Sequence, residues 1–178
     1  MIKLALCFVG LVFLSGCTIT GEPRSENVAF DGEGYIVTTE TLKNSISVGD
    51  VSDFPGTSNF TYSGRLAPNF SDESFKEVLE ESLKNSSLHG NSYVLNAKLI
   101  DSGDWSDWGT SLGSKSRRIE IEYTLADDNE IIYNETIISD IARENYNPLA
   151  PAYLTQRVTA EVNYAENIKL LIEDLNKL

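Results

Sequence analysis

The sequence predicts an α+β domain of two layers, in which a mixed, mostly antiparallel sheet carries two helices on one face. Three observations lead to this prediction. One segment alternates apolar and polar side chains, two others repeat apolar residues at three- and four-residue steps, and the elements follow the order strand, helix, three strands, helix. The strand–helix–strand crossover favours parallel pairing, and the later strands favour an antiparallel meander.

The region before the first helix is predicted to hold one clear strand, at residues 46–51, where Ile46 and Val48 share a face. A shorter strand is expected at 35–41. Residues 52–70 contain two glycines and two prolines, which favours a loop with a short extended piece near 60–62.

The first helix is predicted to begin after Ser71, a residue type that caps helix amino termini well. Asp72 and Glu73 suit the positive end of the helix dipole. The apolar stripe that follows indicates one buried helix face and consists of Phe75, Val78, Leu79, Ser82 and Leu83. Residues 85–90 end the helix.

Three strands are predicted next. In residues 93–100 apolar side chains occur at both odd and even positions, so we expect this strand to be covered on both faces. Residues 118–125 alternate strictly, with one buried and one wet face. A polar turn at 126–130 connects them to a third strand at 131–141, which predicts a hairpin.

A long helix is predicted for the rest of the chain, after a break at residues 145–151 that contains Pro148 and Pro151. At 1.5 Å per residue this helix would span about 35 Å. Its expected buried stripe is Leu154, Val158, Ala165, Ile168, Leu171, Ile172 and Leu175.

The first residues have the layout of a secretory signal peptide. A positively charged start (residues 1–3) precedes an apolar run (4–13) and small residues before Cys17. The run has about 10 residues, whereas a helix that spans a bilayer needs about 20. A transmembrane anchor is therefore not expected.

The stretch Leu14-Ser15-Gly16-Cys17 resembles the lipobox of bacterial lipoproteins. The resemblance implies cleavage between Gly16 and Cys17 and a lipid on the thiol of Cys17, so that the partner is a membrane. Several acyl chains make such attachment durable. An ordinary signal peptide with a chance cysteine is the alternative.

In enterobacterial lipoproteins an Asp after the lipidated cysteine tends to retain the protein at the inner membrane, and here Thr18 follows. The expected location is the periplasmic face of the outer membrane, with the inner membrane as the alternative. We expect residues 1–16 to be the signal peptide, 17–34 the lipidated cysteine and a flexible tether, and 35–178 a single α/β domain.

The composition limits the partners. Removal of 16 residues from the 178-residue chain leaves 162, and loss of Lys3 shifts the formal net charge from −13 to −14. An acidic surface repels phosphate backbones, so nucleic acid is not an expected partner. Both cysteines, Cys7 and Cys17, lie at or before the cleavage point, which leaves no free thiol in the domain. No cofactor is expected.

Two stretches extend the resemblance, namely residues 75–83 with 93–97, and residues 160–172. They are similar to small lipoproteins of Gram-negative bacteria, some of which are described as acyltransferase-like. The element order resembles periplasmic assembly factors such as the amino-terminal domain of TolB. These resemblances imply an envelope location. Hexapeptide-type acyltransferases need many short repeats and a catalytic histidine, and this chain has no such repeat and one histidine, His89.

Trp105 and Trp108 are the only tryptophans and lie in one glycine-containing segment. Tryptophan is enriched at binding hot spots, so this segment is a candidate contact for an envelope protein or a glycan. The alternative is that both rings pack as a structural cover. His89 follows the first helix, where a cation stabilises the helix end, and no nucleophile motif accompanies it.

Two charged clusters complete the candidates. Asp101, Asp104 and Asp107 fail the ligand spacing of a calcium loop, so no metal site is predicted. The basic side chains of Lys115, Arg117 and Arg118 are expected to pair with nearby acids.

We expect a non-catalytic binding or assembly module in the envelope. The alternative is an enzyme on a cell-wall or lipid substrate, with acids such as Asp104 and Glu120 as general acid and base.

Overall fold

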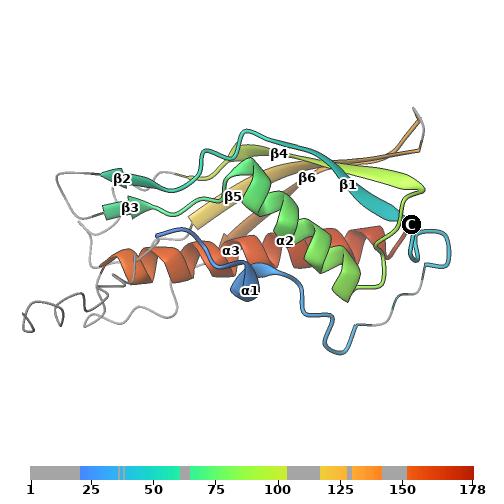
Figure 1. Cartoon of the computed structure of the whole chain (residues 1–178), viewed down its shortest axis with the longest axis horizontal. Coiled ribbons are helices and arrows are strands. Elements are labelled where there is room, and N and C mark those ends of the chain that lie inside the picture. The colour runs from blue at the N-terminus through green and yellow to red at the C-terminus, as the bar shows by residue number, and fades with distance from the viewer. Residues whose placement is uncertain are drawn as a thin grey trace, which may run out of the picture.

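The computed structural model describes residues 21–35, 37, 39–60, 65–103, 117–127, 130–141 and 152–178. Within them lie a four-stranded sheet, a small two-stranded sheet and three helices (Figure 1). The leader, Cys17 and the two tryptophans lie outside the described residues.

The main sheet has the strand order β1-β4-β5-β6. Its strands are β1 (Ile46–Ser52), β4 (Tyr93–Asp101), β5 (Arg117–Asp127) and β6 (Glu130–Ile141). β1 pairs with β4 in parallel, and the other two pairings are antiparallel. The predicted mixed, mostly antiparallel sheet and the predicted element order are therefore confirmed.

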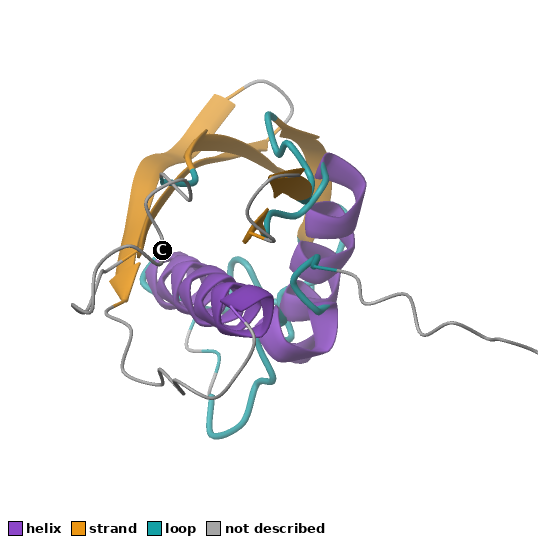
Figure 2. Ribbon diagram, turned by 90° about the vertical axis from the view of Figure 1, so that its left-hand side faces the viewer, coloured by secondary structure: helices purple, strands orange, loops and turns teal. Residues whose placement is uncertain are grey.

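Two long helices cover one face of this sheet. α2 (Asp72–Asn85) contacts β1, and α3 (Ala152–Leu175) contacts β5 and β6. Figure 2 shows the sheet curving over the helix layer. Ser71 caps α2 as predicted, because its side chain accepts a hydrogen bond from the backbone N–H of Ser74 at 3.2 Å.

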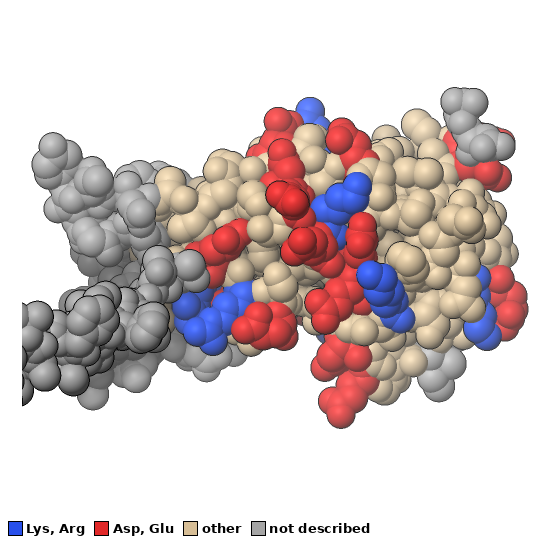
Figure 3. Space-filling view, viewed as in Figure 1, with Lys and Arg blue, Asp and Glu red and all other residues tan. Residues whose placement is uncertain are grey.

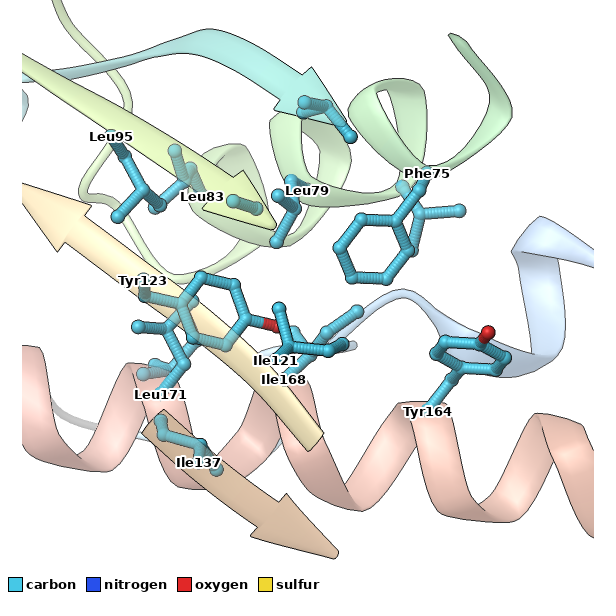
Figure 4. Packing of buried hydrophobic residues seen from close by; sticks show 14 of the residues in the cluster. Phe75, Leu79, Leu83, Leu95, Ile121, Tyr123, Ile137, Tyr164, Ile168 and Leu171 are labelled. Atoms are coloured by element: carbon cyan, nitrogen blue, oxygen red, sulfur yellow. The ribbon is translucent and has the colours of Figure 1, made fainter. Parts of the chain in front are cut away.

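The core lies between the sheet and the helices (Figure 4). Phe75, Leu79 and Leu83 of α2 and Leu95 of β4 are all members of this core, and the spacing of the helix residues predicts their burial. The inward positions of β5 alternate with solvated ones, and the fully buried members of that strand are Ile119, Ile121, Tyr123 and Leu125. The predicted alternation of buried and exposed side chains along β5 is therefore confirmed.

A buried hydrogen-bond network ties α3 to the hairpin. The Tyr123 hydroxyl donates to Asn167 Oδ1 at 3.0 Å, and Asn167 Nδ2 donates to the backbone carbonyl of Ile137 at 2.9 Å. One asparagine therefore links the helix to both strands of the β5–β6 hairpin. Burial raises the pKa of Tyr123 well above its ordinary value, with smaller contributions from Tyr133 and Tyr164.

Two small elements were not predicted as such. Residues 58–67 contain a hairpin of β2 (Ser58–Phe60) and β3 (Arg65–Ala67) in the region expected to be a loop. α1 (Ser25–Val28) is one short helical turn in the region expected to be a tether. The strand expected at 35–41 is wrong, because none of the described residues of that stretch lies in a strand.

Two predictions about burial are also wrong. The second face of β4 is open to solvent, since Val94 and Ile100 are 41% and 49% exposed. On α3 the predicted stripe holds only in the second half of the helix, where Ile168, Leu171, Ile172 and Leu175 are buried. In the first half Val158 is exposed and polar side chains are buried instead.

Candidate functional site

The amino-terminal segment, residues 21–35 (blue in Figure 1), packs against the two long helices. Its helical turn α1 contacts α2 and α3, and the Val28 side chain is completely buried. The prediction that residues 17–34 form a free tether is therefore wrong for residues 21–34. Val28, Ala29 and Phe30 supply apolar surface that the composition of this stretch as a whole conceals.

Glu161 of α3 holds the beginning of this segment. Its Oε1 accepts a hydrogen bond from the backbone N–H of Arg24 at 3.0 Å, and its Oε2 accepts one from Asn27 Nδ2 at 2.9 Å. Arg157, one helical turn earlier, lies with Nε 3.3 Å from the same Oε1. Both charged side chains are almost fully buried, and each provides the opposite charge that a buried ion requires.

The end of α2 holds the middle of the segment. The Phe30 backbone N–H donates to Ser82 Oγ at 3.0 Å, and Asn85 Nδ2 donates to the Phe30 carbonyl at 2.8 Å. Gly32 adopts φ +72°, and a Cβ at this position would overlap the Asn85 carbonyl oxygen. Only glycine fits such a close approach at a positive φ without strain.

The carboxy-terminal half of α3 holds the end of the segment. The Tyr35 hydroxyl donates to the Ile172 carbonyl at 2.9 Å, and the ring of Tyr35 packs edge-on against Phe30 with centroids 5.2 Å apart. Burial and then the charge of Glu173 raise the pKa of Tyr35. The segment therefore touches both helices at three separate places and is part of the folded domain.

A second surface is the outer face of the main sheet. Its strands carry exposed apolar side chains that alternate with the buried ones, namely Val94, Ile100, Ile132 and Ile138. Between them lies a polar middle in which Thr124 pairs with Asn134 across β5 and β6. Exposed apolar side chains on a sheet face offer contacts to another protein.

Acidic side chains gather over α2. Figure 3 shows them in the middle of the molecule, and the helix itself carries Asp72, Glu73, Glu77, Glu80 and Glu81. Two lysines on the same helix offset part of this charge, and Lys84 pairs with Glu80 at 3.8 Å. This face is suited to water and disfavours contact with anionic surfaces.

The predicted site residues are placed as follows. Gly16, Cys17, Trp105, Trp108, Asp104, Asp107 and Lys115 lie outside the described residues. Gly103 and Arg117, which flank the tryptophan segment closely in sequence, are described. Asp101 accepts a hydrogen bond from the Gly103 N–H at 2.6 Å, as in a turn.

The charged candidates that the structure describes have structural contacts. His89 is exposed, and its backbone N–H donates to the Leu83 carbonyl at 3.0 Å, just beyond the end of α2. Arg118 Nε lies 2.5 Å from Glu120 Oε1, which confirms the expected pairing of a basic side chain with an acid on the hairpin. In the described part of the chain, no three histidine, cysteine or acidic side chains gather as metal ligands would.

Arg157 and Glu161 were not predicted from the sequence as site residues. Their four-residue spacing on a helix is a usable signal for an ion pair. It does not reveal that the pair is buried, because the residues that cover it are more than 130 positions away in the sequence.

Among the described helices, none is long and apolar enough to cross a membrane.

No protein-family model and no curated protein sequence matches this chain. Several solved structures share its fold. A candidate lipoprotein from Caulobacter crescentus has a TM-score of 0.52 at 14% identity and covers 78% of this chain and 92% of its own. The protein XCC0632 from Xanthomonas campestris, of the family DUF330, has a TM-score of 0.53 at 9% identity, over 82% and 89%.

A third structure, of an uncharacterized protein, has a TM-score of 0.50 at 13% identity and covers 75% of this chain and 94% of its own. At these identities the likeness shows a common fold. The chain therefore has the fold of a candidate bacterial lipoprotein and of two further proteins.

Proposed function

We propose that this protein is a lipid-anchored envelope protein that acts as a non-catalytic binding or assembly module. The observation that carries the anchor is the stretch Leu14-Ser15-Gly16-Cys17, which follows a charged start and an apolar run. The likeness of the fold to a candidate lipoprotein supports the same class. The expected location is the periplasmic face of the outer membrane, because Thr18 and not an aspartate follows the cysteine.

The packing of the amino-terminal segment supports a positioning role for the anchor. A free tether would let the domain diffuse around its lipid, whereas this chain is held to α3 from Arg24 onward. The covalent link from lipid to folded domain is therefore short. A module that is held close to a membrane meets membrane partners at a high effective concentration.

The binding surface in this proposal is the outer face of the sheet. Val94, Ile100, Ile132 and Ile138 are between 39% and 49% exposed there. The partner is a protein of the envelope with an apolar surface of its own. The element order, which resembles assembly factors such as the amino-terminal domain of TolB, agrees with such a role.

Photo-crosslinking in intact cells tests the proposed function. A photoreactive amino acid is placed at Ile138 on the outer sheet face, and at Glu73 on the acidic face of α2 as the matched control. The proposal predicts a discrete envelope adduct from position 138 that is absent from position 73. It also predicts loss of that adduct in the Cys17→Ser variant. Adducts of equal yield from both positions would contradict a specific surface.

A further inference from the structure

The covalent chain limits how far the folded domain can lie from the lipid. This step rests on the proposed attachment at Cys17. Gly21 is the first described residue and is buried, and four peptide units separate its Cα from that of Cys17. At 3.8 Å for each unit the two Cα atoms are at most about 15 Å apart.

The point where the chain enters the domain is in the amino-terminal half of α3. Arg24 is hydrogen-bonded to Glu161, the tenth of the 24 residues of the helix. From Glu161 the helix runs about 14 Å back to Ala152 and about 21 Å on to Leu175. Figure 1 shows the start of α3 at the same end of the molecule as β2 and β3, opposite the carboxyl terminus. The lipid therefore holds this end closest to the bilayer.

The exposed stripe of α3 changes its chemistry along the helix. In the amino-terminal half it presents Val158 and Val162, which are each 39% exposed. In the carboxy-terminal half charges replace them, and Lys169 pairs with Glu166 at 3.7 Å and with Glu173 at 3.9 Å. The half nearest to the chain entry thus turns valines outward and the other half turns ions outward.

The buried side of the same half is polar. Gln156 and Asn163 are buried there beside Ala160, and the amino-terminal segment covers Arg157 and Glu161, whereas a helix on a water-facing surface usually buries mainly apolar side chains. Valines on the outside and polar groups on the inside reverse the usual arrangement. This reversal suits a helix whose outer side meets lipid, because apolar contact with the interface between headgroups and acyl chains is favourable.

From these observations we infer that the amino-terminal half of α3 lies against the bilayer surface, with Val158 and Val162 in contact with lipid. The carboxy-terminal half of the helix and its ion pairs then point away into water. The acidic face of α2 is unsuited to be the contact surface, because its carboxylates would be repelled by anionic lipids.

The test uses the full lipidated protein, whose domain contains no cysteine. Val162→Cys and Glu173→Cys are each labelled with an environment-sensitive fluorophore and reconstituted into phosphatidylethanolamine–phosphatidylglycerol vesicles. Some of the lipids carry a nitroxide near the headgroup end of the acyl chain. The inference predicts quenching at position 162 that exceeds quenching at position 173 by at least about threefold, since only the first label reaches the interface. Equal quenching, or stronger quenching at 173, overturns the inference.

Two further readings separate the alternatives. A blue shift at position 162 without quenching by lipid would mean that a second copy of the chain covers the valines, and this contradicts lipid contact. Mass spectrometry of the Cys17 peptide is run on the same sample. A peptide without acyl chains contradicts the proposed anchor itself, whereas an acylated peptide with equal quenching contradicts only the orientation.

Discussion

At the scale of single residues, Glu161 connects more partners than any other side chain of the amino-terminal contact. One carboxylate accepts from Arg24 and Asn27 and balances the charge of Arg157. Glu161→Ala should lower the free energy of unfolding by about 3 kcal/mol, because it leaves a buried guanidinium without its carboxylate. Urea unfolding measures the change.

The matched control for Glu161 is Glu166→Ala on the same helix. Glu166 is partly exposed and pairs only at 3.7 Å with Lys169, so its loss should cost less than about 0.5 kcal/mol. Equal losses for the two variants would be incompatible with a special role of the buried carboxylate.

Gly32 offers a second prediction at this scale. Gly32→Ala places a Cβ against the Asn85 carbonyl, whereas Gly34→Ala, at nearly the same φ, has nothing within 4 Å. The left-handed backbone alone costs about 1–2 kcal/mol for a residue with a Cβ. Gly32→Ala should therefore be the more destabilising of the two in thermal unfolding. Equal destabilisation would show that the segment does not rest on α2.

A residue whose partner is near in sequence can be predicted from the sequence, whereas a residue whose partner is distant cannot. Ser71 was predicted as a helix cap because its partner, the Ser74 N–H, is three residues away. The partners of Glu161 and Gly32 are distant in sequence, and no local pattern announces them. Cys17 is a third case, since the four residues that resemble a lipobox are adjacent in the sequence and can be recognised without knowledge of the fold.

At the scale of elements, the strict alternation of β5 predicted its buried face because a helix layer covers only one side of the sheet. β4 carries apolar residues at both odd and even positions. This pattern predicted two covered faces, whereas the structure has one. The prediction that Val158 of α3 is buried was wrong for a related reason. Spacing identifies a stripe, but it does not say whether protein, lipid or water lies beside it.

The tie between α3 and the hairpin predicts the response to alkaline pH. Tyr123 ionises near pH 10 in the unfolded chain, and burial raises its pKa in the fold. Stability is therefore complete below pH 10 and falls above it, because the unfolded state then binds fewer protons than the folded state. Each such tyrosine contributes a slope of up to about 1.4 kcal/mol per pH unit.

Tyr123→Phe isolates this contribution. At neutral pH the variant should lose about 1 kcal/mol, because Asn167 Oδ1 no longer receives its hydrogen bond. Above pH 10 its stability should fall less steeply than that of the parent. Urea unfolding from pH 7 to 11 measures both effects, and parallel curves for the two proteins would refute the assignment to Tyr123.

At the scale of the whole molecule, residues 21–34 are part of the folded domain, which was expected to begin at residue 35. A chain that starts at Tyr35 loses the buried Val28 side chain and the hydrogen bonds to Glu161 and Ser82. It should be less stable by about 3 kcal/mol than a chain that starts at Thr18. Thermal and urea unfolding compare the two, and identical midpoints would mean that the segment adds nothing to the fold.

The boundary was misplaced because the composition of residues 18–34 is mostly polar, which is typical of linkers. Three apolar residues in a row, from Val28 to Phe30, are enough to dock the segment when helix ends offer hydrogen-bond partners. Under the proposed attachment at Cys17, a short link would join lipid and domain, in place of a long tether.

We propose that Cys17 carries the lipid that holds this protein in the envelope. The most direct measurement is mass spectrometry of the amino-terminal peptide of protein purified from membranes, with the Cys17→Ser variant in parallel. We expect the parent to begin at Cys17 with diacylglyceryl and acyl groups, and the variant to keep its leader without lipid. A parent protein with an unmodified Cys17, or with its leader intact in the membrane fraction, would contradict the account.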